Sequence, residues 1–141
     1  MSLDVIFLLH TAIEGIFGLQ LIFFPKTIFF LSIADDYAQF IAGGYGAALI
    51  GSAVTSAFAF GLPSMLPCKR AAALGFMVYH ALFSLFAFQT RTQGPLKTTE
   101  AWTLTILHLT LFFLFYAWYK ITGEQVRKFI KQNKDKSSSS H

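Results

Sequence analysis

The chain has 141 residues, a length that favours a single domain. Hydrophobic residues make up 55% of the sequence and charged residues only 13%, against about 25% in a typical soluble protein, which excludes a soluble globular domain. The net charge of +4 is accompanied by no nucleic-acid motif, so no nucleic-acid partner is predicted, and the single Cys68 excludes an intrachain disulfide.

Residues 3–24 form the first apolar run, which is long enough to cross a bilayer as a helix. Asp4 is the only early charge and no small-residue cleavage site follows, so we expect a first membrane span and not a signal peptide. The apolar stretch 27–34 is too short to span, and we expect it at the membrane interface or packed back on the bundle. Asp35 and Asp36 follow, where carboxylates stabilise the start of a helix.

Residues 37–61 form the second predicted span, which is rich in small side chains. Helices in lipid associate where small residues let their backbones approach closely. We therefore expect the second span to be central to the bundle, with a ligand groove as the alternative use of its small residues. They lie in two adjacent rows, Gly43, Ala47 and Gly51 in one and Gly44, Ala48 and Ser52 in the other.

The third and fourth predicted spans are residues 71–88 and 101–119, separated by a polar Gly-Pro loop. Aromatic residues near both ends of the fourth span are typical of the two membrane interfaces. The fold class predicted is therefore all-α, a four-transmembrane-helix bundle within residues 1–120. Residues 121–141 are predicted to form a basic, partly disordered tail.

The distribution of basic residues predicts the orientation of this multi-pass membrane protein. Of the 11 Lys and Arg residues, only Lys26, Arg91 and Lys97 lie on the side of the bilayer opposite both termini. Because basic residues are enriched in cytoplasmic segments, we predict that the N- and C-termini are both cytoplasmic. The sequence does not identify which membrane the protein occupies.

Ionisable side chains lie inside the spans, where they are rare and often functional. His10 and Glu14 share one helical face because they are four residues apart. Helix rise places Glu14, His80 and His108 at similar depths, about 14–17 Å from the cytoplasmic ends of their helices. Together with Tyr79, these residues form the predicted site for a ligand or a proton.

Several interpretations of this site stay open. In the first interpretation the site has a purely structural role, as a hydrogen-bonded network that fixes helix register. A proton-coupled transporter would load and release a proton at Glu14, and a lipid- or sterol-modifying enzyme would use a Glu–His pair for acid–base chemistry. Zinc suits the same side chains, but the spacing does not demand it, so no metal and no catalytic residue is predicted. No cofactor is predicted either, with a haem between His80 and His108 as the one option.

Two glycine-containing segments carry a family resemblance. They are Gly15-Ile16-Phe17-Gly18, leading to Phe24-Pro25, and Gly43-Gly44-Tyr45-Gly46. Over residues 12–88 the chain resembles the DoxX-like group of small four-helix membrane proteins, which implies a compact four-helix bundle and no particular activity. The function we predict is a non-catalytic membrane bundle that binds an apolar ligand, a lipid, a partner helix or a second copy of itself.

Overall fold

The computed structural model describes residues 3–27, 35–92, 94 and 96–138, with the backbone alone from 133 to 138. Its helices are α1 (Val5–Phe23), the 3-10 helix η1 (Pro25–Thr27), α2 (Asp36–Phe60), α3 (Pro67–Gln89) and α4 (Thr98–Ser138). All four α-helices are long and apolar enough to cross a membrane. The prediction of an all-α chain with four such helices is therefore confirmed. The side on which the termini lie stays a prediction, and most of the short apolar stretch 27–34 falls outside the described residues.

The helix ends follow from local chemistry. The Asp35 side chain accepts a hydrogen bond from the backbone N–H of Ala38 at 2.7 Å, which caps α2 as expected from the acidic pair. The third helix begins at Pro67, earlier than predicted, because proline fits the first turn of a helix without losing a hydrogen bond. The Glu100 carboxylate accepts from the backbone N–H of Lys97 at 3.0 Å and stabilises the start of α4.

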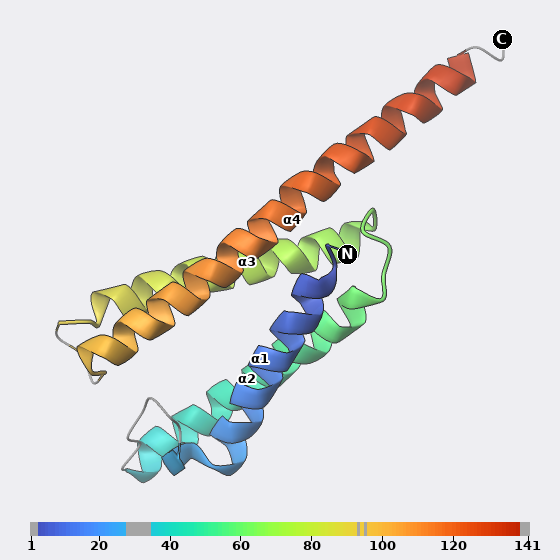
Figure 1. Cartoon of the computed structure of the whole chain (residues 1–141). Helices are drawn as coiled ribbons and strands as arrows, with labels where there is room; N and C mark the ends of the chain where they lie inside the picture. Colours follow the sequence, from blue (N-terminus) through green and yellow to red (C-terminus); the bar gives the residue numbers. More distant parts are fainter. Residues whose placement is uncertain (1–2, 28–34, 93, 95, 139–141) are drawn as a thin grey trace.

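The fourth helix does not end at residue 119. It continues through the segment predicted as a tail up to Ser138, and Figure 1 shows this part projecting beyond the other helices. The segment is rich in Lys, Arg, Glu and Gln, which favour helix, so an uninterrupted helix is physically reasonable. Residues 139–141 lie outside the described residues.

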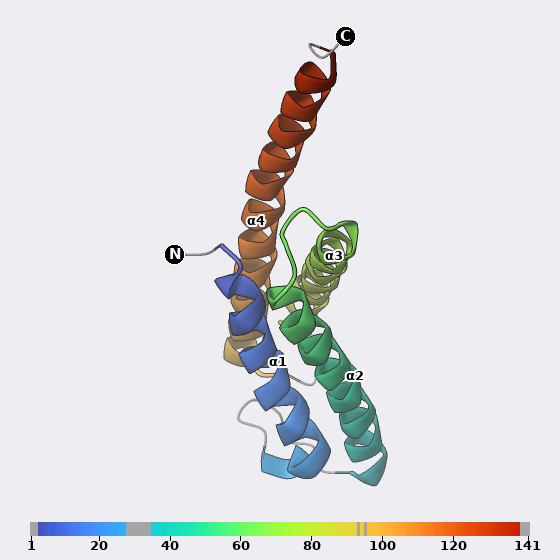
Figure 2. The same cartoon turned by 90° about the vertical axis from the view of Figure 1, so that its right-hand side faces the viewer.

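The four helices are arranged as two antiparallel pairs. α1 packs along α2 and α3 packs along α4, whereas the backbones of the two pairs approach each other at few points. Figures 1 and 2 show the pairs close together near the N-terminus, and Figure 1 shows them diverging toward the other end. The expectation that the second span is central is wrong, because α2 has no close backbone contact with α4 in the described part of the chain.

α1 and α2 cross at two glycines. A Cβ atom added to Gly18 would lie 2.9 Å from the carbonyl oxygen of Gly46, and one added to Gly46 would lie 2.8 Å from that of Gly18. Only glycine allows the two backbones to approach this closely. Further along the same interface, Ser56 donates a hydrogen bond to the carbonyl oxygen of Phe7 at 2.9 Å.

The small residues predicted to pack α2 lie on other faces of the helix. A Cβ atom added to Gly43, Gly44 or Gly51 would meet no atom within 4 Å, and Ala47 and Ala48 are exposed. The buried face instead carries Ala42, Gly46, Leu49, Ala53, Ser56 and Ala59. Small residues occur on every side of α2, so their spacing did not identify the buried face. A role for the exposed rows, and for half-buried Ser52, in packing between chains stays a prediction.

A polar group that is largely buried, the Asp4 cluster (Asp4, Ser64, Lys69 and Trp118), joins the helices near the N-terminus. The Lys69 ammonium is fully buried and donates to the Asp4 carboxylate at 2.8 Å and to the carbonyl oxygen of Leu62 at 2.8 Å. The same Asp4 oxygen accepts from the Trp118 indole at 3.0 Å and from the Ser64 hydroxyl at 3.1 Å. This cluster ties the start of α1 to α3, α4 and the α2–α3 loop.

Candidate functional site

The ionisable residues predicted inside the spans meet between the two helix pairs. His10 and Glu14 come from α1, His80 from α3 and His108 from α4, and we call these four residues the His/Glu cluster. His10 and His80 are fully buried, and Glu14 is only 3% exposed. Nε2 of His10 lies 3.7 Å from a carboxylate oxygen of Glu14, as the four-residue spacing on one helical face requires.

Aromatic side chains hold the histidine rings in place. The His10 ring centroid lies 4.3 Å from that of Phe76, 5.2 Å from that of Phe115 and 5.1 Å from that of His80. On the other side of His80, its Nδ1 lies 2.8 Å from Nδ1 of His108, a hydrogen bond that joins α3 to α4. One imidazole donates in this bond and the other accepts. The sequence predicted that His80 and His108 lie at a similar depth to Glu14, and the structure brings the two imidazoles into contact.

The His/Glu cluster contains an unusual concentration of unpaired polar atoms. Among the described residues, five buried side-chain nitrogen or oxygen atoms have no hydrogen-bond partner. Four of them belong to this cluster: Nδ1 and Nε2 of His10, Oε2 of Glu14 and Nε2 of His80. An unpaired buried polar atom costs about 1–3 kcal/mol. A group of four such atoms therefore marks a place where a bound species would stabilise the protein.

Tyr79 lies beside the His/Glu cluster and also contacts α2. Its hydroxyl group hydrogen bonds with the hydroxyl group of Tyr45, which links α3 to α2. Its ring lies beside the rings of His80 and His108, at centroid distances of 4.9 and 5.7 Å. Sequence reasoning missed Tyr45, although a tyrosine within a glycine-rich run of a span was an available signal.

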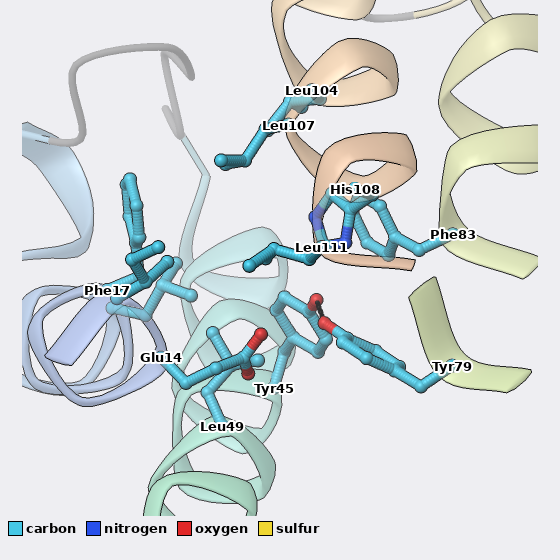
Figure 3. Close-up of a pocket in the computed structure, with 12 residues that line it drawn as sticks. Glu14, Phe17, Tyr45, Leu49, Tyr79, Phe83, Leu104, Leu107, His108 and Leu111 are labelled. Carbon is cyan, nitrogen blue, oxygen red and sulfur yellow. Dashed lines mark hydrogen bonds between the residues drawn. The ribbon is translucent and has the colours of Figure 1, made fainter. Parts of the chain in front are cut away.

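A cavity of about 100 Å³ lies between the two helix pairs and beside the His/Glu cluster. Its walls are almost entirely apolar, and Figure 3 shows the Glu14 carboxyl group projecting from α1 toward Tyr45 and Tyr79. The polar side chains among the lining residues are Glu14, Tyr45, Tyr79 and His108. All four helices contribute to the lining: Ile13, Glu14, Phe17, Leu21, Tyr45, Leu49, Tyr79, Phe83, Leu104, Leu107, His108 and Leu111.

His80 and His108 are hydrogen bonded directly to each other, with their Nδ1 atoms 2.8 Å apart. This bond orients both rings. A haem between the two histidines stays a prediction.

Comparison of the chain with family models, with curated proteins and with solved structures gives no match. Function therefore has to be argued from the site itself. The site combines an apolar cavity with a carboxyl group, two phenols and an imidazole. Such a combination can receive the apolar part of a ligand and hydrogen bond with one small polar group on it.

Proposed function

We propose that this is a multi-pass membrane protein that binds a lipid-like ligand, without catalysis, in the cavity between its two helix pairs. The observation that carries the proposal is the apolar cavity with four polar side chains from four different helices, Glu14, Tyr45, Tyr79 and His108. Ligand sites in proteins are commonly apolar pockets in which a few polar groups fix orientation. The ligand class is an apolar chain or ring that ends in a hydroxyl or carbonyl group.

The volume of the cavity limits how much of the ligand it holds. An apolar cavity of about 150 Å³ is large enough for benzene. A cavity of about 100 Å³ therefore receives the polar end of a ligand and a few carbon atoms. The rest of the ligand would lie in the surrounding lipid. A molecule already dissolved in the bilayer is the natural occupant, because it reaches the cavity without leaving apolar surroundings.

Photocrosslinking tests this proposal. The protein would be placed in lipid nanodiscs with a long-chain alcohol that carries a diazirine near its hydroxyl end and a terminal alkyne. We expect labelled peptides to map to the cavity walls on α4, around Leu104 and Leu107. Leu107→Trp fills the cavity and should abolish this labelling, whereas Ile106→Trp, at a position 59% exposed, should leave it unchanged. Equal labelling of all three proteins would contradict the proposal.

Proton-linked transport through Glu14 is the second candidate. The observation that favours it is that Glu14 lines the cavity and also has a buried carboxylate oxygen without a partner among the described residues. Protein reconstituted in liposomes with an internal pH-sensitive dye would show proton entry coupled to an added organic cation. Glu14→Gln should abolish that entry; if wild type and variant behave alike, transport through Glu14 is excluded.

The orientation is part of the same proposal. With both termini on the cytoplasmic side, the basic part of α4 meets the anionic leaflet, where each nearby cation contributes about 1 kcal/mol. A reporter that is active only in the cytoplasm, fused to either end of the chain, should be active in both fusions. Activity in only one fusion would contradict a four-span topology, and activity in neither would reverse it.

A further inference from the structure

We infer that His10, Glu14 and His80 form a binding site for one divalent transition-metal ion, with Zn²⁺ as the best-suited metal. Each of the three side chains offers a ligand atom, and these atoms all lie within 4.8 Å of one another. The inference goes beyond lipid binding and does not depend on it, because His10 and His80 are not among the residues that line the cavity.

The donor atoms are free to coordinate a metal. Both nitrogens of His10, Oε2 of Glu14 and Nε2 of His80 are buried and have no hydrogen-bond partner among the described residues. Nitrogen and oxygen lone pairs that no N–H or O–H group uses are what a metal ion requires. The sequence spacing did not demand a metal here, but the structure brings one ligand atom from each of the three side chains within 4.8 Å of the other two.

The hydrogen bond between His80 and His108 is also typical of a histidine that binds a metal. Metal-bound histidines usually donate their other ring N–H to a neighbouring acceptor, which fixes the tautomer. Nδ1 of His80 lies 2.8 Å from Nδ1 of His108. When His80 is the donor in this bond, its Nε2 carries the lone pair and faces His10 and Glu14. His108 thereby acts as a positioning residue and not as a ligand.

The donor atoms would have to move closer together to bind one zinc ion. Zinc bonds of 2.0–2.1 Å in tetrahedral geometry place neighbouring ligand atoms about 3.4 Å apart. Nε2 of His10 and Oε1 of Glu14 are already 3.7 Å apart, which is too long for a hydrogen bond and close to the distance between two zinc ligands. The other donor atoms lie within 4.8 Å of one another, so rotation of the side chains would have to bring them closer together.

The ligand set indicates the metal. Two histidines and one glutamate form the set of several zinc sites that keep a fourth position open for water. Imidazole nitrogen suits zinc, copper, iron and nickel, whereas magnesium and calcium prefer sites made of oxygen alone. Copper(II) favours a square-planar arrangement, whereas zinc has no geometric preference from its d electrons and adapts to these three ligands.

A buried water molecule is the competing occupant, because it also bonds with two to four polar atoms. A measurement of metal retention distinguishes a bound metal ion from a buried water molecule. The protein would be purified through an affinity tag without histidine, stripped with a chelator, incubated with Zn²⁺ and desalted. Elemental analysis should find one Zn²⁺ per chain, and Co²⁺ in its place should give the intense visible absorption of a four-coordinate site. A wild-type protein that retains no metal and shows no such absorption would overturn the inference in favour of water.

Variants assign the ligands. His10→Asn, His80→Asn and Glu14→Gln should each abolish retention, and His108→Asn should weaken Zn²⁺ affinity about 10–100-fold, as expected for a residue that orients a ligand. His141→Ala is the matched control, because it removes a histidine from the end of the chain and should change nothing. Retention that survives the three ligand variants, or that is lost in His141→Ala, would place the metal elsewhere and overturn the inference.

Folding of each variant would be checked by circular dichroism and gel filtration. If a variant fails to fold, X-ray absorption of the Co²⁺-loaded wild type decides instead. A first shell with two imidazoles supports the inference, and a shell without imidazole overturns it. Failure of lipid crosslinking would leave these results unchanged, since the crosslinking variant Leu107→Trp is not a metal ligand.

Discussion

The two buried polar clusters of this protein differ in how completely their atoms are paired. In the Asp4 cluster, one carboxylate oxygen accepts from Lys69, Trp118 and Ser64, and the lysine also donates to the backbone. In the His/Glu cluster, four buried atoms have no partner among the described residues. Both clusters connect α1 to α3 and α4, so position alone does not explain the difference. Buried polar groups that are hydrogen bonded to one another hold helices together, whereas buried polar groups without a partner are stabilised when a ligand binds to them.

The largest effect should come from Lys69. Lys69→Met removes the fully buried cation that pairs with the 22% exposed Asp4 carboxylate, and breaking such a largely buried ion pair costs up to about 3–5 kcal/mol. Unfolding by sodium dodecyl sulfate in mixed micelles, followed by circular dichroism, would measure the loss. Lys97→Met is the control: Lys97 is 83% exposed in its pair with Glu100, so the change should stay below about 1 kcal/mol. Equal losses of stability in Lys69→Met and Lys97→Met would show that the Asp4 cluster does not stabilise the fold.

A substitution at His108 should cause the next largest loss of stability, because His108 hydrogen bonds with Nδ1 of His80, the nitrogen of that ring that has a partner. His108→Leu leaves Nδ1 of His80 buried without a partner and should destabilise the fold by about 1–3 kcal/mol. The same unfolding assay in the presence of a chelator measures it. Leu109→Ala, at an exposed position one residue away, should change the stability much less. A His108→Leu protein as stable as wild type would mean that the imidazole pair contributes nothing.

Trp118 tests a single hydrogen bond of the Asp4 cluster. Trp118→Phe keeps an aromatic ring against Phe7 but removes the indole N–H that donates to Asp4 at 3.0 Å. Losing one bond to a charged acceptor should cost about 1.5–3 kcal/mol at most, and less here because Asp4 keeps its other donors. Trp102→Phe, at an exposed position, is the control and should be neutral. If Trp102→Phe costs as much, ring size and not the hydrogen bond explains the effect.

The smallest effect should follow loss of the contact between the two tyrosines. Tyr79→Phe removes the hydrogen bond with Tyr45 and keeps the ring beside His80. Side-chain hydrogen bonds inside membranes contribute about 0.6 kcal/mol on average, and we expect a loss of that size. Tyr45→Phe should give the same loss, and the double variant should add little to either. Fully additive losses would show that the two hydroxyl groups act separately.

Much of the architecture could be predicted from the sequence. Four apolar runs of sufficient length identify four helices, and helix rise places Glu14, His80 and His108 at similar depths. What the sequence could not show is which helices pair and which face of α2 is buried. Small residues on every side of α2 leave its rotation undetermined, and the Gly18–Gly46 contact and the Ser56 hydrogen bond show which face is buried.

The Asp4 cluster also escaped sequence reasoning, for a physical reason. Asp4 and Lys69 lie 65 positions apart near the ends of two predicted spans, where charged residues are ordinarily exposed at the interface. Their burial depends on how α1 meets α3, which no local pattern encodes. The unpaired atoms of the His/Glu cluster depend in the same way on side-chain geometry, so the sequence predicted the residues of the site but not which of their atoms lack partners.

The most direct test of this account compares Lys69→Met with His10→Leu in the same unfolding assay, with a chelator present. His10→Leu replaces a ring whose two nitrogens lack partners with an apolar side chain of similar size. The account predicts opposite outcomes: a loss of up to about 3–5 kcal/mol for Lys69→Met and equal or higher stability than wild type for His10→Leu. If His10→Leu loses as much stability as Lys69→Met, the His/Glu cluster is a structural network like the other, and the distinction between the two clusters is wrong.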